Sequence, residues 1–224
     1  MDQQPEAERR EPLFNAPLPS LILVAVILGS YAWESIWGGD AVISALAFAP
    51  VDLDQGRWLP VLTVMFVHGG WAHAIINALG ALAFGPPVAR AMGPRPRGVA
   101  LFFIFYLVCG VLSTLAYAVM HLHDPEQVVG ASGAISGLMG AASRMLGPSW
   151  AGLSPIVSRP VISIGFGWVL VNLLMVTTGA TPFMAGARVA WEAHIAGFIC
   201  GVLLAGPFVR LAAPDIPMDR ADLT

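Results

Sequence analysis

GASGAISGLMG, residues 130–140, opens an apolar segment and places a serine where a membrane helix is expected to be least polar. A stripe of small residues runs through this stretch, formed by Gly130, Gly133, Gly137 and Gly140. Small-residue stripes let two helix backbones approach closely in lipid, and polar side chains in a bilayer are costly and tend to be functional. The stretch therefore predicts a closely packed membrane helix with Ser132 at its start.

The composition of the whole chain is that of a membrane protein. Of its 224 residues, 57% are hydrophobic and 11% are charged, and the mean hydropathy is +0.74. A soluble domain carries about 25% charged residues, so we predict an all-α polytopic membrane protein. The formal net charge of −3 argues against a nucleic-acid partner. Cys109 and Cys200 lie in apolar runs and are expected to pack as small side chains without forming a disulfide.

Six segments approach the ~20 mostly apolar residues that a membrane span needs. They are residues 18–37, 68–88, 98–120, 131–147, 160–178 and 190–211. The chain that precedes the first segment is net acidic, so we expect that segment to be a retained span and not a cleaved leader. The predicted organisation is a polar N-terminal tail over residues 1–17, a six-span domain over 18–211 and a short C-terminal tail over 212–224.

The connections between spans carry their own signals. Residues 38–67 are too apolar for a solvated linker, so we expect short helices that lie partly in the membrane interface. Pro86-Pro87 and the prolines of residues 94–97 are expected to bracket a tight connection between the second and third spans. Phe183 and Met184, in the last outer connection, are candidates for a cap over a cavity.

The arginines predict the orientation, because the chain has no lysine. With the N-terminus inside, nine arginines fall on the inner side and two, Arg57 and Arg188, on the outer side. Both termini are therefore expected in the cytoplasm. An arginine-only basic set suggests a GC-rich bacterial genome, so we expect the bacterial inner membrane.

In this orientation, the second, fourth and sixth spans all begin at the outer side and carry polar residues there. His73 and Asn77 are four residues apart and share a helix face, while His194 lies in the first turns of the sixth span. The fourth segment is short for a full crossing at ~1.5 Å per residue, so Ser132 should be recessed below the outer surface. The positive end of its helix would favour a developing oxyanion.

Helix packing favours contact between these segments. Gly197 and Gly201 form a small pair in the sixth span that can meet the glycine stripe of the fourth. Such an approach would permit a hydrogen bond between Ser132 and His194. Each feature alone has a plainer explanation, because a membrane serine often bonds its own helix and glycine stripes mostly serve packing. Their coincidence at one depth favours a reactive site.

Three stretches together resemble the rhomboid family of intramembrane serine proteases: HGGWAHAIIN at residues 68–77, GASGAISG at 130–137 and AHIAGFICG at 193–201. They come in the family's order and on its second, fourth and sixth spans. The resemblance implies a six-helix bundle that cleaves transmembrane segments of membrane-protein substrates near the outer face, without a cofactor. It also implies a dyad with Ser132 as nucleophile and His194 as general base.

The resemblance implies further roles at the same site. The backbone N–H of Ser132 and the side chains of His73 and Asn77 would form the oxyanion hole. His68 would support the outer connection, and small residues would support the dyad at Gly130, Gly133 and Gly197. Glu192 lies about 200° around the helix from His194, so we do not expect it to complete a triad.

Two features depart from the family's pattern. Position 136 often holds an aromatic residue that stacks on the histidine, and here it is Ser136, so His194 must be positioned by other neighbours. The family often has a Trp-Arg pair in the first connection, and here Arg57-Trp58 stands reversed and shifted. The anchoring of that connection therefore remains open.

Other functions make different predictions. A catalytically inactive rhomboid-like protein that binds membrane clients would be expected to lack Ser132 or His194. A zinc protease could use three histidines, His68, His73 and His194, but no acidic residue stands beside them as a base. A transporter or channel would place charged residues in the middle of spans. The substrate and the oligomeric state have no signal in the sequence.

Overall fold

The computed structural model describes residues 16–147, 152–179 and 189–212, and these are mostly helical. A single isolated bridge joins Phe48 to Val128. The predicted all-α class is confirmed. Most of the predicted N-terminal tail, nearly all of the C-terminal one, and Phe183 and Met184 lie outside the described residues.

Within those residues, five helices are long and apolar enough to cross a membrane. They are α1 (Leu18–Trp33, continued by a π-helical turn over Glu34–Gly38), α5 (Trp71–Met92), α6 (Pro96–Met120), α8 (Arg159–Thr178) and α9 (Trp191–Ala212). They correspond to five of the six predicted spans. The remaining one, residues 131–147, contains α7 (Ser132–Ser143), whose 12 residues are too few for that criterion. The number of six spans therefore stays a prediction.

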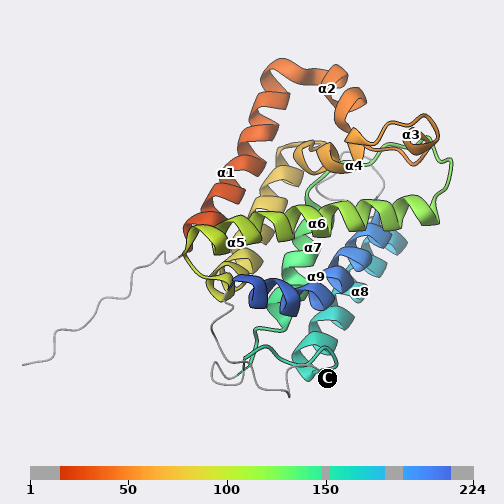
Figure 1. Cartoon of the computed structure of the whole chain (residues 1–224). Helices are drawn as coiled ribbons and strands as arrows, with labels where there is room; N and C mark the ends of the chain where they lie inside the picture. The colour runs from red at the N-terminus through yellow and green to blue at the C-terminus, as the bar shows by residue number, and fades with distance from the viewer. Residues whose placement is uncertain (1–15, 148–151, 180–188, 213–224) are drawn as a thin grey trace, which may run out of the picture.

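Helix α7 lies in the middle of the bundle, where it contacts α5, α6, α8 and α9 (Figure 1). Every residue from Gly133 to Ser143 is buried, and most are glycine, alanine or serine. Twelve residues give a helix of about 18 Å, against ~30 Å for the hydrocarbon core of a bilayer. A short helix of small residues can be surrounded by longer ones, so α7 is buried from Gly133 on, while its first residue, Ser132, is half-buried.

The contact between α7 and α9 is made backbone to backbone. A Cβ atom on Gly197 would overlap the carbonyl oxygen of Gly133, and one on Gly201 would overlap that of Gly137. The predicted meeting of the two glycine pairs is therefore confirmed. Because no side chain separates the helices here, polar groups near their first turns can come within hydrogen-bond distance.

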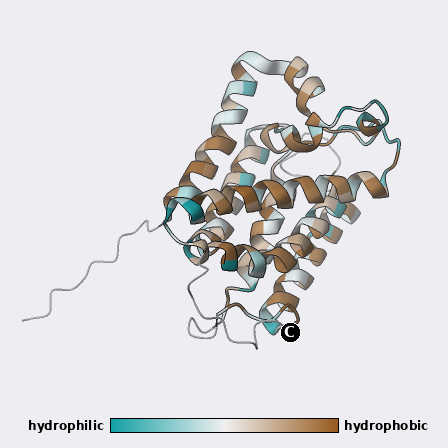
Figure 2. Ribbon diagram, viewed as in Figure 1, coloured by the Kyte–Doolittle hydropathy of each residue, from teal (hydrophilic) through white to brown (hydrophobic). Residues whose placement is uncertain are grey.

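The outer surface of the bundle is apolar, as an integral membrane protein requires. Figure 2 shows hydrophobic residues over much of the long helices, with the more hydrophilic residues gathered in the connection that contains α3 and near some helix ends. On α8, side chains such as Ile162, Phe166 and Leu174 are more than half exposed. Large apolar side chains exposed over a whole helix face are stable in lipid and costly in water.

Residues 38–67 form short helices, as predicted: α2 (Gly39–Leu46), α3 (Val51–Asp54) and α4 (Leu59–Thr63), followed by a 3₁₀ turn over Val64–Phe66. Phe48 and Val67 are buried in this connection, which explains its apolar composition. Its placement in the membrane interface stays a prediction.

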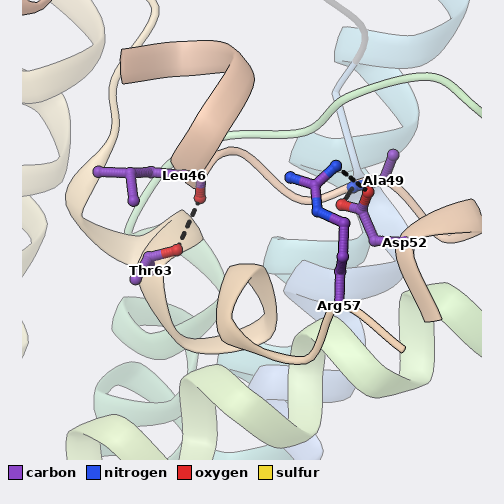
Figure 3. A network of polar contacts seen from close by, with 5 residues as sticks. All are labelled: Leu46, Ala49, Asp52, Arg57 and Thr63. Carbon is purple, nitrogen blue, oxygen red and sulfur yellow. Dashed lines mark hydrogen bonds and ion pairs between the residues drawn. The ribbon is translucent and has the colours of Figure 1, made fainter. Parts of the chain in front are cut away.

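A buried carboxylate holds this connection together (Figure 3). Asp52 accepts a hydrogen bond of 3.0 Å from the backbone N–H of Ala49 and pairs with Arg57 at 3.1 Å. Nearby, the hydroxyl of Thr63 donates to the carbonyl of Leu46 at 2.9 Å and ties α4 to α2. The reversed Arg57-Trp58 pair thus anchors the connection through Arg57, while Trp58 is 62% exposed.

Replacing Asp52 by alanine is expected to loosen this connection. The substitution leaves the buried N–H of Ala49 without its acceptor and frees Arg57, at a cost of about 1–3 kcal/mol. The measurement is limited proteolysis of the purified protein in detergent, read by the site of first cleavage. Asp54→Ala is the matched control, because Asp54 forms an exposed pair with His123. Equal resistance of the Asp52 variant and this control would contradict the anchoring role.

Two details of the spans differ from the expectation. Helix α5 continues through Pro86 and Pro87 and ends at Met92, beyond residue 88. Proline removes backbone hydrogen bonds, but Gly85, Pro86 and Val88 are packed in the bundle, which holds this turn helical. The same helix begins at Trp71, so His68 lies before it and not within it. Cys109 and Cys200 are both free, as predicted.

Candidate active site

Ser132 is the first residue of α7, at the end of the helix where backbone N–H groups lack intrahelical partners. The chain reaches it through Gly130, whose φ of +118° is rarely adopted by residues with a side chain. The backbone N–H of Gly130 donates to the carbonyl of Val64 at 3.0 Å, which fixes this turn against the first connection. Ser132 is half-buried and stands at the positive end of a helix, as expected, while its depth below the outer membrane surface stays a prediction.

His194 meets Ser132 across the α7–α9 contact. Its Nε2 lies 2.8 Å from the Ser132 hydroxyl, although 62 positions separate the two residues in the chain. His194 stands in the first turn of α9 and is 7% exposed. A hydroxyl hydrogen-bonded to an imidazole nitrogen is the arrangement in which histidine can remove the serine proton.

His73 and Asn77 lie on one face of α5, as predicted, and approach the backbone just before Ser132. A Cβ atom on Gly130 would be 2.7 Å from His73 Nε2 and 3.8 Å from Asn77 Nδ2. The absence of a side chain at position 130 therefore leaves room for both polar groups. One N–H of the Asn77 amide donates to the carbonyl of His73 at 3.0 Å, and its second N–H can serve another acceptor.

His68 lies just before α5 and contacts the ring of His73. Its ring is fully buried and packs edge-on against His73, with centroids 5.3 Å apart. The backbone N–H of His68 donates to the carboxylate of Glu34 at 3.0 Å, which connects it to the end of α1. Burial, followed by repulsion from His73, lowers the pKa of His68 to about 3, so its ring is neutral at physiological pH.

Two residues of α8 complete the surroundings of His194. The Nδ1 atom of His194 is 2.7 Å from Oδ1 of Asn172, and the Trp168 ring lies 5.5 Å from the imidazole at a tilt of 36°. Neither residue belongs to the three stretches that carry the sequence signal. An amide inside the apolar segment 160–178 is itself a signal that could have found Asn172, because polar side chains are rare in spans.

In the bonds described, neither Ser136, which stands where the family often has an aromatic residue, nor Glu192, which was excluded from a triad, is bonded to His194. The Ser136 hydroxyl donates to the carbonyl of Ser132 at 2.8 Å and so turns toward its own helix. Glu192 is 3.0 Å from His121, whose ring stacks on Tyr117. Glu192 therefore does not contact His194 through the bonds described, which agrees with its exclusion from a triad.

Ser132 lies between two cavities. The larger has a volume of about 180 Å³, is lined almost entirely by apolar atoms and runs between α5, α7 and α8 past Asn77, Ile135 and Trp168. The smaller, about 30 Å³, lies on the side of α6 and α9 and is lined in part by Ser113 and Tyr117. The apolar cavity therefore reaches Ser132 from the α5–α8 side.

The histidines do not assemble into a metal site. Both ring nitrogens of His194 are engaged, by Ser132 and by Asn172, and His68 is packed behind His73. Among the described residues, there is no group of three metal-ligating side chains. The zinc-protease alternative required His68, His73 and His194 to face one point, which this geometry does not provide.

Comparisons with known proteins match the part of the chain that contains these residues. The family profile described as the rhomboid domain matches residues 55–211. The chain is 29% identical over 162 residues to Rhomboid protease GluP of Bacillus subtilis, covering 68% of this chain and 30% of that protein. It is 25% identical over 163 residues to RHOMBOID-like protein 5 of Arabidopsis thaliana, covering 73% of this chain and 47% of that protein. The chain thus spans less than half the length of these relatives.

Proposed function

This chain belongs to the rhomboid family, and on that premise we propose that it is a serine endopeptidase that hydrolyses transmembrane segments of other membrane proteins. The observation that carries the proposal is the 2.8 Å contact between Ser132 and His194 at the start of α7. A serine, a histidine and free backbone N–H groups are enclosed there in an otherwise apolar bundle. Serine acyl transfer requires these three elements.

The proposed reaction begins with a substrate segment that unwinds locally, because a helical backbone shields its carbonyl groups. Ser132 Oγ attacks the scissile carbonyl carbon while His194 Nε2 takes the hydroxyl proton. The carbonyl oxygen becomes an oxyanion, which the Ser132 backbone N–H, His73 and Asn77 stabilise. His194 then gives the proton to the leaving amine, and water, activated by the same imidazole, hydrolyses the acyl-enzyme.

The supporting residues have steric roles in this proposal. Gly130 leaves open the space between Ser132 and the two α5 side chains, and Gly133 and Gly197 bring the backbones of α7 and α9 into contact. His68 supports the ring of His73 from behind. We propose that the substrate enters laterally from the lipid next to α8, and the apolar cavity between α5 and α8 supports this route.

We further propose that both termini face the cytoplasm of a bacterial cell and that Ser132 opens toward the outer face of the inner membrane. The support is the distribution of arginines, nine against two, with Arg57 and Arg188 on the proposed outer side. The proposed domain comprises residues 18–211 between two short polar tails.

The proposal is tested by labelling the purified protein with a fluorophosphonate probe. The wild-type protein should form a covalent bond between the probe and Ser132 Oγ, and Ser132→Ala should show no labelling. Labelling should persist in the presence of a metal chelator. The second candidate function is a catalytically inactive protein that only binds membrane clients, because one relative is named as rhomboid-like. Such a protein would not be labelled at all. Labelling of Ser132→Ala equal to wild type would reject the assignment.

A second expectation concerns the oxyanion hole. Asn77→Ala removes an N–H that would meet the oxyanion, and removal of one such donor lowers kcat by about 10²–10³-fold. KM for a membrane-anchored substrate should change little, because the bond strengthens in the transition state. A rise in KM at constant kcat would show instead that Asn77 binds the ground state.

A further inference from the structure

Asn172 is a buried amide on α8, which has the smallest buried share of the five candidate spans found among the described residues. It is 1% exposed, whereas its neighbours Leu173 and Leu174 are 55% and 62% exposed. It is also the single amide in the sequence of α8. A polar side chain on such a helix is costly unless a specific partner takes it up, and here that partner is His194.

The orientation of the Asn172 amide is fixed by its own helix. Its Nδ2 atom is 2.8 Å from the carbonyl oxygen of Trp168, which can only accept a hydrogen bond. The NH₂ group must therefore point to Trp168, and Oδ1 points to His194 Nδ1, 2.7 Å away. The reverse orientation would set two oxygens against each other at one end and leave the amide N–H groups facing His194 at the other.

We propose that Asn172 is a positioning residue that holds His194 in the tautomer needed for catalysis. Because Oδ1 can only accept, the proton of the neutral imidazole must be on Nδ1. Nε2 then carries a lone pair and accepts the hydrogen bond from the Ser132 hydroxyl at 2.8 Å. Trp168 carbonyl, Asn172, His194 and Ser132 thus form a chain with a single consistent arrangement of protons. Its catalytic consequence rests on the proposed function.

The same helix also supplies the aromatic contact that position 136 lacks. Trp168 stands one turn before Asn172 and its ring lies 5.5 Å from the imidazole. Ser136, bonded to the carbonyl of Ser132, does not take that place. When His194 accepts the serine proton, its Nδ1–H bond to Asn172 is retained and becomes charge-assisted. The histidine therefore remains in one orientation through both proton transfers.

The first test reads the tautomer directly and does not depend on activity. Wild-type protein with ¹⁵N-labelled histidine is examined by NMR in detergent, with His194→Gln identifying the His194 signals. We expect His194 to be neutral with its proton on Nδ1. In Asn172→Leu, which has similar volume and no acceptor, we expect a mixture of tautomers. An Nε2-protonated wild type, or an unchanged spectrum in Asn172→Leu, would overturn the proposal.

The second test measures cleavage of a membrane-anchored substrate. Asn172→Leu should lower kcat on the order of 10–100-fold and change KM less than about twofold, because Asn172 acts through His194 and not on the substrate. Asn172→Asp keeps the acceptor for His194, and a protonated carboxyl can still donate to the Trp168 carbonyl, so this variant should retain most of the activity. Thr177→Val is the matched control on α8, because its exposed hydroxyl bonds only carbonyls of its own helix in the bonds described.

The two failures are distinguishable. A wild-type protein that cleaves no substrate, yet holds His194 protonated at Nδ1 only when Asn172 is present, would refute the proposed function and support the role of Asn172. An active wild type together with a fully active Asn172→Leu variant would refute the role of Asn172 and leave the proposed function intact.

Discussion

Replacing Ser132 by alanine is expected to abolish cleavage of a membrane-anchored substrate, with a loss on the order of 10⁴-fold or more in kcat. His194→Ala should cost about as much, because the hydroxyl is a poor nucleophile without a base 2.8 Å away. The double variant should be no slower than either single one, since the two residues act as a unit. The measurement is the rate of product formation in proteoliposomes at saturating substrate.

The matched control for this pair is Ser143→Ala, at the other end of α7. Its hydroxyl is buried and donates to the carbonyl of Gly140 in its own helix, so the substitution removes a serine hydroxyl from α7 without touching His194. The control should cleave at the wild-type rate. Losses that multiply in the double variant would contradict the dyad, as would an equal loss in Ser143→Ala.

The second large effect is on stability. Gly201→Ala would drive a methyl group into the carbonyl oxygen of Gly137, and neither helix backbone can move aside without separating α7 from α9. We expect the free energy of unfolding to fall by about 1–3 kcal/mol or more, which is the typical cost of an overpacked core. Activity should fall with it, because the same contact holds Ser132 against His194. Thermal unfolding in detergent measures the stability change.

Gly167→Ala on α8 is the matched control, because a Cβ atom there has no neighbour within 4 Å. Alanine is favoured over glycine within a helix by roughly 1 kcal/mol, so this variant should be as stable as the wild type or more stable. Both variants replace a glycine by alanine. Gly201→Ala should lower Tm, and Gly167→Ala should leave it unchanged or raise it. If both shifted Tm in the same direction by similar amounts, the α7–α9 contact would not be the cause.

The sequence was sufficient for the parts of the site that recur as local patterns. His73 and Asn77 stand at helical spacing, and the glycine stripes of α7 and α9 predict contact between those two helices, which brings Ser132 and His194 together. Their chemical roles stay predictions. Asn172 was not identified as a site residue from the sequence, because hydropathy identifies α8 as a span but does not show which of its faces meets α9.

The remaining differences have similar causes. The continuation of α5 through Pro86 and Pro87 depends on packing around that turn, which local proline rules do not include. The pairing of Arg57 with Asp52 depends on how α3 folds back on the chain, so the reversed Arg57-Trp58 order could not be interpreted from spacing alone.

The backbone contact between α7 and α9 also bears on biosynthesis. A chain is synthesised from its N-terminus, so Ser132 on α7 is made before α8 and α9, and it meets His194 only across that contact. In the proposed enzyme, the serine of the growing chain has no base until the last helix is translated and docks. In that proposal, a nascent chain interrupted before α9 would carry the nucleophile without its base.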